Sequence, residues 1–203
     1  MPRPRFYKLT DERRRAVLDT AAAEFAAHGY HDASINRVQA KLKVSKGAFY
    51  YWFDDKEDLF IETISSRLAD MSSSVGGILQ GAVQPGRYWP QVEDGIRGVF
   101  RYALAHPQSI ALIKAASALP PDTSPRMAAL WQRGTDAIAR IIEEGQQREL
   151  IRTDLPSSLL SNLTFAVGEA CDRHVLSQPD LETIDVDAWV ALYLDLLRRM
   201  LRR

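Results

Sequence analysis

The sequence predicts an all-α protein of about nine helices, and three observations support this fold class. Apolar residues recur at intervals of three and four along most of the chain, and no segment alternates apolar and polar residues over more than a few positions. Clusters of proline, glycine and serine divide these periodic segments into helical lengths. With 203 residues and 46% apolar content, the chain can bury a sizeable core as one large domain or two small ones.

The first helix is expected from Thr10 to about His28. Thr10 can cap it, acidic residues follow in its first turn, and Gly29 can end it in a left-handed conformation. Two shorter helices come next, and each begins after a serine, Ser34 or Ser45. A serine hydroxyl can accept a hydrogen bond from backbone N–H groups that are unpaired at a helix start. This stretch therefore indicates a helix-turn-helix.

The two short helices can pack their apolar faces together and leave a polar face outside. Apolar residues at helical spacing form the inner face: Ile35, Val38, Leu42, Phe49 and Phe53. The outer face holds Arg37, Lys46, Tyr50 and Tyr51. Cationic and phenolic side chains suit phosphates and base edges, so this face is a candidate DNA-binding surface.

Six more helices are expected after Phe53, which places a three-helix domain at residues 1–54 and a second helical domain at 55–203. The fourth helix starts near Lys56, among acidic residues, and ends between about Ser73 and Gly81. Prolines, glycines and an acidic loop then separate the remaining helices, which are expected over 92–106, 109–119, 125–150, 154–177 and 187–202.

The last helix is apolar over more than one narrow stripe. Its large apolar residues include Trp189, Leu192, Tyr193 and Leu196. Such a helix has to be covered on two sides. Cover by a second copy of the chain would make a homodimer with these residues in its interface, whereas complete burial within one chain is the alternative.

Charge is distributed unevenly along the chain although the net charge is zero. Residues 1–56 hold eleven Lys/Arg against seven Asp/Glu, and residues 57–203 hold fifteen against nineteen. A basic first quarter fits a polyanion-binding head, although a solvated surface can produce the same split. The first nine residues are basic and contain prolines. We expect them to form a disordered tail, and the alternative is an arm lying along DNA.

Cysteine content and hydropathy exclude several classes of protein. Cys171 is the single cysteine, so an internal disulfide framework and a cysteine-rich zinc site are both excluded. The first residues lack the apolar run of a secretory signal, and no eighteen consecutive residues are apolar. We expect a cytoplasmic protein with no cofactor, no metal and no membrane partner.

The N-terminal 50 or so residues resemble the DNA-binding domain of the TetR family of bacterial transcriptional regulators. The resemblance rests on two motifs: Ala21-Ala22-x-x-Phe25-x-x-His28-Gly29-Tyr30-x-x-Ala33-Ser34-Ile35 and Val44-Ser45-Lys46-Gly47-Ala48-Phe49-Tyr50-Tyr51-Trp52-Phe53-x-x-Lys56-Glu57-Asp58-Leu59-Phe60. It implies a repressor that binds a pseudo-palindromic operator as a homodimer, with half-sites roughly 34 to 36 Å apart. It also implies release by a small molecule bound in the second domain, with the long helix after Lys56 as the lever.

The resemblance also implies roles for single residues of the DNA-binding surface. Ser34 and Tyr50 are expected to contact phosphates, and Lys46 and Lys56 add positive charge at helix starts. Arg37 and Tyr51 are expected to contact base edges. The remaining members are Ser45, which caps the second short helix, Gly47, which allows close approach of the backbone, and Ala48, which can meet a thymine methyl group.

The turn departs from the family pattern. Family members usually have Ala-Gly-Val-Ser where this chain has Leu42-Lys43-Val44-Ser45, and usually Ala at Gln39. Lys43 either adopts a left-handed conformation at a cost of order 1 kcal/mol, or the turn differs slightly. The lysine also adds a cation near the expected DNA, so the operator sequence cannot be inferred from the family.

Two further sites and one alternative class follow from side chains outside the motif. Phe100, Trp131 and Phe165 lie on the inward faces of three helices and could line an effector pocket or simply form core. A cluster of Glu169, Cys171, Asp172 and His174 raises the possibility of an enzyme, but a cysteine on an apolar helix is most often a small core residue, and no catalytic residues are assigned. A helical interaction module without DNA binding is a third class, suggested only by Lys43.

Overall fold

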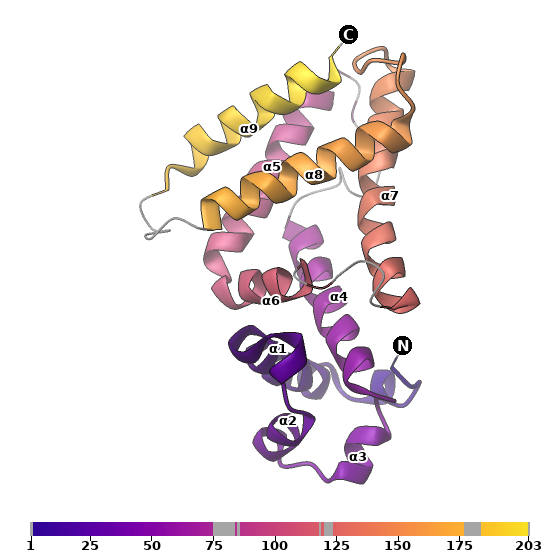
Figure 1. The fold of residues 1–203 in the computed structure, drawn as a ribbon, viewed down its shortest axis with the longest axis vertical. Helices are drawn as coiled ribbons and strands as arrows, with labels where there is room; N and C mark the ends of the chain where they lie inside the picture. The colour runs from indigo at the N-terminus through magenta and orange to yellow at the C-terminus, as the bar shows by residue number, and fades with distance from the viewer. Residues whose placement is uncertain are drawn as a thin grey trace. The chain divides into compact units, whose positions relative to one another are not determined.

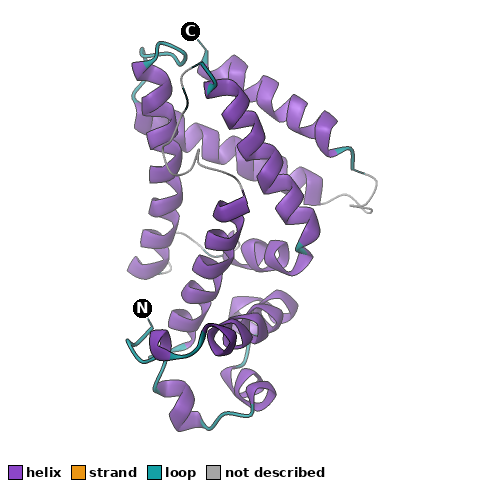
Figure 2. Cartoon of the chain, turned by 180° about the vertical axis from the view of Figure 1, so that it is seen from behind, coloured by secondary structure: helices purple, strands orange, loops and turns teal. Residues whose placement is uncertain are grey.

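The computed structural model describes residues 2–74, 84, 86–117, 119, 124–176 and 184–202. These residues form helices and loops without a strand (Figures 1 and 2). The elements are a 3-10 helix η1 (Phe6–Lys8) and nine α-helices: α1 (Asp11–Asp32), α2 (Ile35–Leu42), α3 (Lys46–Tyr50), α4 (Lys56–Ser74), α5 (Tyr88–Ala105), α6 (Pro107–Ser117), α7 (Pro125–Gln147), α8 (Ser157–Leu176) and α9 (Val186–Leu201). The all-α prediction is confirmed.

Proline placement explains where the observed helices begin earlier than expected. Helix α5 starts at Tyr88 and not at Val92, because Pro90 falls within its first turn, where the missing N–H is tolerated. Helix α6 starts at Pro107, before the expected start at residue 109, because a proline is tolerated at the first position of a helix. The expected end of the fourth helix between Ser73 and Gly81 lies mostly outside the described residues.

The chain divides into two compact units, and the division is not a single cut. The first unit combines Met1–Asp70 with His106–Leu130, and the second combines Met71–Ala105 with Trp131–Arg203. Within the first unit, α1 packs against both α2 and α6. The domain boundary expected at residues 54 and 55 stays a prediction.

Aromatic side chains fill the core of the first unit. The rings of Phe25 and Phe60 pack edge to face with centroids 4.7 Å apart, and Phe49 and Phe53 have centroids 5.4 Å apart. All four residues are buried. Helix α1 is interrupted at Gly29, whose φ of 68° lies in the region that favours glycine, at the position where the sequence predicted the helix to stop.

The second unit has its own core, in which α5 packs on α9. Tyr88 donates a hydrogen bond from its hydroxyl to the Ile141 carbonyl at 2.8 Å. Gly145 makes this approach possible, because a Cβ there would lie 2.6 Å from the Tyr88 hydroxyl oxygen. Within the described ranges, no helix combines the length and the apolar character needed to cross a bilayer.

Candidate nucleic-acid interface

Serine caps begin both helices of the helix-turn-helix. Ser34 Oγ accepts a hydrogen bond from the Arg37 N–H at 3.4 Å before α2. Ser45 Oγ accepts one from the Ala48 N–H at 3.1 Å before α3. Each hydroxyl satisfies one of the backbone donors left unpaired at a helix start, so both predicted caps are confirmed.

The turn between these helices keeps the left-handed conformation. Lys43 has φ 54° and ψ 43°, and its N–H bonds back to the Ala40 carbonyl at 3.2 Å. The next N–H, from Val44, bonds to the Gln39 carbonyl at 3.1 Å, so α2 ends as a helix closed by a glycine normally does. The first of the two alternatives left by the sequence is therefore confirmed, and Lys43 carries strain of order 1 kcal/mol.

A buried carboxylate joins α1 to α2. Glu24, with a side chain only 1% exposed, accepts hydrogen bonds from the Ser34 N–H at 3.0 Å and from Arg37 Nε at 2.7 Å. Lys41 Nζ lies 3.6 Å from the second oxygen of this carboxylate. Burial alone would raise the pKa of Glu24, but the hydrogen bonds from Arg37 and Ser34 outweigh it and hold the pKa below its usual value.

Two of the cations expected on DNA are turned toward the protein. Besides Glu24, the Arg37 guanidinium contacts the Asp32 carbonyl at 2.8 Å. Lys56 Nζ donates to the carbonyls of His31 and Ala33, at 2.8 and 3.3 Å, and lies 4.9 Å from the Tyr30 ring centroid. Both side chains would have to leave these partners to bind DNA, and their predicted roles there stay predictions.

The outward face of α3 carries the other expected residues. Lys46 is exposed, and its ammonium lies 5.9 Å from the centroid of the Tyr50 ring. Tyr50 and Tyr51 are 37% and 47% exposed, which is high for aromatic side chains. A methyl group added at Gly47 would meet nothing closer than Ser45 Oγ at 3.9 Å. The chain itself therefore does not require glycine at this position, which leaves room for close approach by a ligand.

The N-terminal arm, residues 2–9, is packed against the helix-turn-helix region. Phe6 is fully buried, and its ring centroid lies 4.8 Å from that of Phe53. The Arg3 N–H donates to the Trp52 carbonyl at 2.8 Å. The expectation of a disordered tail is wrong for residues 2–9, because the sequence reasoning weighed the basic and proline residues but gave no role to Phe6.

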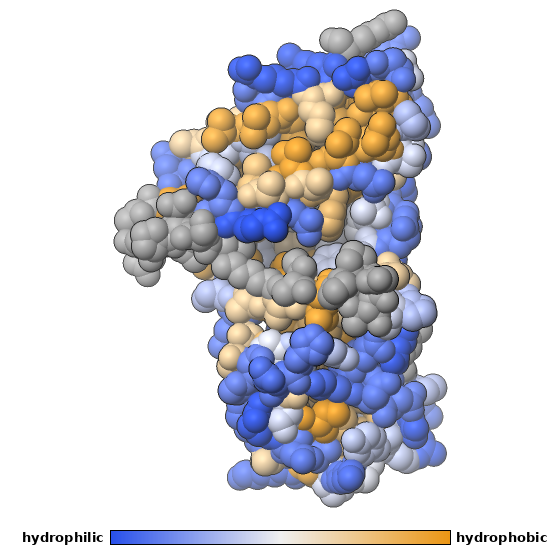
Figure 3. Space-filling view, in the orientation of Figure 1, coloured by the Kyte–Doolittle hydropathy of each residue, from blue (hydrophilic) through white to orange (hydrophobic). Residues whose placement is uncertain are grey.

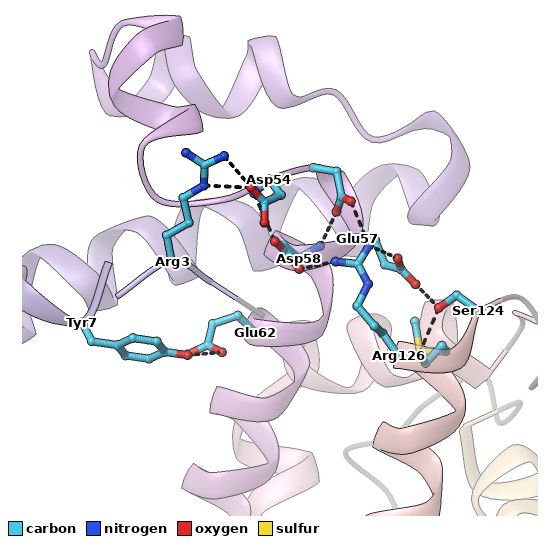
Figure 4. A network of polar contacts seen from close by, with 10 residues as sticks. Arg3, Tyr7, Asp54, Glu57, Asp58, Glu62, Ser124 and Arg126 are labelled. Atoms are coloured by element: carbon cyan, nitrogen blue, oxygen red, sulfur yellow. Dashed lines mark hydrogen bonds and ion pairs between the residues drawn. The ribbon is translucent and has the colours of Figure 1, made fainter. Parts of the chain in front are cut away.

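Side-chain contacts also tie the arm to α4 and to the loop before it, and Figure 4 shows two of them. Arg3 Nη2 lies 2.6 Å from the Asp54 carboxylate, and the Tyr7 hydroxyl donates to Glu62 at 3.1 Å. Burial and the Glu62 carboxylate raise the pKa of Tyr7 to about 12. The arm is therefore held at both of its ends, by Arg3 and by Tyr7.

Arg126 of α7 gathers the acidic residues at the start of α4 (Figure 4). Its guanidinium contacts Asp55 at 2.8 Å and also pairs with Glu57 and Asp58, of which Asp58 is fully buried. Burial alone would raise the pKa of Asp55, but the hydrogen bond from Arg126 outweighs it and lowers that pKa. Ser124, near Arg126 in the sequence, caps α7 by accepting a hydrogen bond from the Met127 N–H at 3.1 Å.

The aromatic residues of the expected effector pocket lie in the second unit but do not all meet. Trp131 and Phe165 pack edge to face with ring centroids 6.2 Å apart. Phe100 belongs to another cluster, with Val175 and Val190. The pocket stays a prediction, and its strongest structural element is the pair of Trp131 with Phe165.

The residues expected in a dimer interface separate into two sets. Trp189 and Tyr193 are partly buried and pack on clusters within the chain. Leu192 and Leu196, in contrast, are 49% and 44% exposed. Two exposed leucines of α8 that sequence reasoning did not single out complete an apolar patch, visible over α8 and α9 in Figure 3: Leu159 and Leu163. Their spacing of four residues was the available signal.

The cluster that suggested an enzyme has a structural explanation in part. The ring of His174 stacks on Trp189 with centroids 5.6 Å apart, and Cys171 is half-buried. The side chain of Asp172 lies outside the described residues. Among the side chains that are described, no group of three His, Cys, Asp or Glu residues could hold a metal ion.

Comparison with known proteins identifies the family of the head. Residues 17–63 match the sequence model described as bacterial regulatory proteins of the tetR family. The chain is similar to the HTH-type transcriptional repressor NicS of Pseudomonas putida, with 23% identity covering 95% of this chain and 94% of that protein. It is 32% identical to the HTH-type transcriptional repressor AcnR of Corynebacterium diphtheriae over 47% of this chain, and this match spans less than half of AcnR, 42%. These relatives are transcriptional regulators and not enzymes.

A solved structure shares the fold over most of this chain. The transcriptional regulator FadR from Bacillus subtilis, in complex with stearoyl-CoA, superposes with a TM-score of 0.75 at 16% identity, covering 90% of this chain and 96% of FadR. At this identity the likeness is one of fold.

Proposed function

Because the chain belongs to the TetR family of bacterial regulatory proteins, we propose that it is a ligand-responsive repressor that binds a pseudo-palindromic operator as a homodimer. The observation that carries this proposal is the outward face of α3. There Lys46 and Tyr50 are exposed on a short, capped helix, and Tyr51, also exposed, directly follows it. The buried pair of Phe49 and Phe53 fixes this helix in place. In this proposal the protein acts in the cytoplasm. Residues 1–54 form its DNA-binding domain, and residues 55–203 form its effector-binding and dimerisation domain.

In this proposal α3 of each subunit enters a major groove, and the two half-sites lie roughly 34 to 36 Å apart. Lys46 and Tyr50 contact phosphates, Tyr51 and Ala48 face base edges, and the backbone at Gly47 approaches the duplex closely. Glu24 supports this arrangement from behind, because it fixes the start of α2 through the Ser34 N–H.

The apolar patch on α8 and α9 supplies the proposed dimer interface. Leu159, Leu163, Leu192 and Leu196 expose large apolar side chains that a second copy would cover. Leu196→Glu should convert dimers to monomers in light scattering, because it places a charge within that interface. Leu150→Glu is the matched control, since Leu150 is exposed outside α8 and α9. An unchanged mass for Leu196→Glu would rule out this interface.

The effector is proposed to bind in the second unit against Trp131 and Phe165. The fold is shared with a regulator that was solved with stearoyl-CoA, so acyl-CoA compounds are the first class to screen by thermal shift. Release of DNA follows if the compound binds better to the form of the dimer that does not match the operator. If no compound stabilises the protein while DNA binding persists, the proposal that an effector binds against Trp131 and Phe165 is excluded.

Selection from a pool of random duplexes, followed by mobility-shift titration, tests the function itself. We expect enrichment of an inverted repeat and tighter binding to it than to scrambled duplexes. Absence of any sequence preference at every salt concentration would overturn the repressor and favour a helical interaction module. Turnover of a small molecule without DNA would instead favour an enzyme.

A further inference from the structure

Arg5 has an unusual position in the N-terminal arm. Its guanidinium carbon lies 3.7 Å from the centroid of the Tyr51 ring, so the cation stacks on the tyrosine that directly follows α3. Both side chains are exposed. A cation–π contact at an exposed site is strong enough to bias the orientation of a long side chain.

The arm that carries Arg5 is fixed on both sides of it. Phe6 is fully buried, Pro2 is buried, and the Arg3 N–H bonds to the Trp52 carbonyl. The position of Arg5 beside α3 therefore follows from the packing of its neighbours. An arm fixed in this way loses little further entropy when its arginine binds a ligand.

Arg5 differs from Arg3 and Arg14, which lie near it in the sequence, in having no acidic partner among the described residues. Arg3 pairs with Asp54, and Arg14 pairs with Asp11. For Arg5, the described part of the chain offers no carboxylate within ion-pair distance. Stacking uses the face of the guanidinium, and its N–H donors project in the plane, where they can bind two oxygens of one anion.

We propose that Arg5 and Tyr51 form one anion-binding element of the DNA interface, in which the guanidinium binds a backbone phosphate of the operator while the ring holds it in place. This proposal rests on the proposed function, since it adds the arm to the same interface. A duplex is favoured over an acidic protein because Tyr51 directly follows α3, which also presents Lys46. Bidentate contact between arginine and phosphate is among the stronger charge-assisted interactions.

Arg5→Ala tests the proposal in the full-length protein, with the duplex obtained by selection as the probe. Each charge–phosphate contact contributes a slope of about 0.9 in log K against log salt, and a dimer carries two copies of Arg5. We therefore expect the slope to decrease by about two between 50 and 200 mM salt, with at least roughly tenfold weaker binding at 50 mM. The midpoint of thermal unfolding should fall only slightly, because Arg5 is exposed and the substitution removes a single cation–π contact.

Arg140→Ala is the matched control. Arg140 is an exposed arginine of α7 in the second unit, so its removal changes the net charge equally. We expect it to bind with the wild-type slope. Arg5→Lys should keep the slope and lose part of the affinity, because lysine keeps the charge but not the planar stack.

The outcomes separate this proposal from the proposed function. If wild-type protein binds the duplex and Arg5→Ala binds with the same slope and affinity, the arm is not part of the interface and the repressor stands. A loss that Arg140→Ala reproduces would also overturn the proposal, because it would reflect net charge alone. A loss confined to one operator sequence would indicate a base contact in place of a phosphate contact. Failure of the wild type to bind any duplex overturns both proposals.

Discussion

Two groups of basic residues in the first unit differ in what their charged ends contact. In the inner group, each cation ends on a carboxylate or a carbonyl of another segment: Arg37 on Glu24, Lys56 on His31 and Ala33, and Arg126 on Asp55, Glu57 and Asp58. In the outer group, Arg5, Lys43 and Lys46 are exposed, and the described residues offer them no acidic partner. The inner group holds helices together, and the outer group is available to a polyanion.

This difference teaches that charge in a DNA-binding motif has two separable uses. A cation that already satisfies a protein carboxylate gains little from DNA, because the first partner must be given up. A cation without such a partner gains the full effect of counterion release. The two groups should therefore respond differently to mutation: the inner one through stability, the outer one through salt-dependent affinity.

Glu24→Gln should have the largest effect, because it removes the charge that the inner group surrounds. We expect the free energy of unfolding to fall by roughly 2 to 3 kcal/mol at pH 7, as charge-assisted hydrogen bonds from Ser34 and Arg37 weaken. Urea denaturation measures this loss. The control is Glu12→Gln, at an exposed position of α1, which should change the free energy of unfolding by only a few tenths of a kcal/mol.

Comparison of the wild type with Glu24→Gln also tests whether folding lowers the pKa of Glu24. A carboxyl whose pKa is lower in the folded state stabilises the fold above its unfolded pKa, near 4.5, and loses that contribution as the pH falls through the folded value. The difference between wild type and Glu24→Gln should therefore be constant near neutral pH and shrink below about pH 4.5. A difference that grows on acidification would contradict the ionised, hydrogen-bonded carboxylate.

Arg126→Ala should have the next largest effect. It leaves the acidic residues at the start of α4 without their shared cation, and Asp58 among them is buried. We expect a loss of about 1.5 kcal/mol of unfolding free energy, which is moderate because the Arg126 side chain is 38% exposed. Arg133→Ala, at an exposed position of the same helix, is the control and should lie within about 0.5 kcal/mol of wild type. Equal stability of the two variants would show that the cluster contributes nothing.

Lys46→Ala and Lys56→Ala compare the outer and inner groups directly, since both lysines were expected on DNA. Lys46→Ala should unfold as wild type does and bind the selected duplex with a salt slope smaller by about two per dimer. Lys56→Ala should lose stability, because its ammonium bonds two backbone carbonyls, and keep the slope. The reverse pattern would mean that Lys56 leaves the protein when DNA binds.

Local features of this chain could be predicted from its sequence because their causes lie within a few residues. Ser34, Ser45 and Ser124 cap helices through the N–H three positions ahead, and Lys43 takes the left-handed position because α2 ends there. The packing of Phe49 on Phe53 likewise follows from a spacing of four.

The partners of the cations could not be predicted, because they lie far away in the sequence. Glu24 is on a different helix from Arg37, and Arg126 meets residues of α4 that only the folded chain brings near. The order of the arm depends in the same way on the contact of Phe6 with Phe53. Hydropathy of α9 indicated cover on two sides but could not say which leucines remain exposed.

Lys43→Gly should have only a small effect on folding and is informative for that reason. Glycine relieves left-handed strain of order 1 kcal/mol but gains about 0.4 to 1 kcal/mol of chain entropy in the unfolded state, so the net change should lie within about 0.5 kcal/mol. If Lys43 reaches a phosphate, this variant should bind DNA more weakly and with a smaller salt slope. Lys43→Asn separates charge from backbone, because asparagine also accepts the left-handed conformation without a charge. Equal weakening in both variants would assign the effect to the lysine charge, whereas wild-type affinity at every salt concentration would place Lys43 outside the DNA interface and leave the outer group with Arg5 and Lys46.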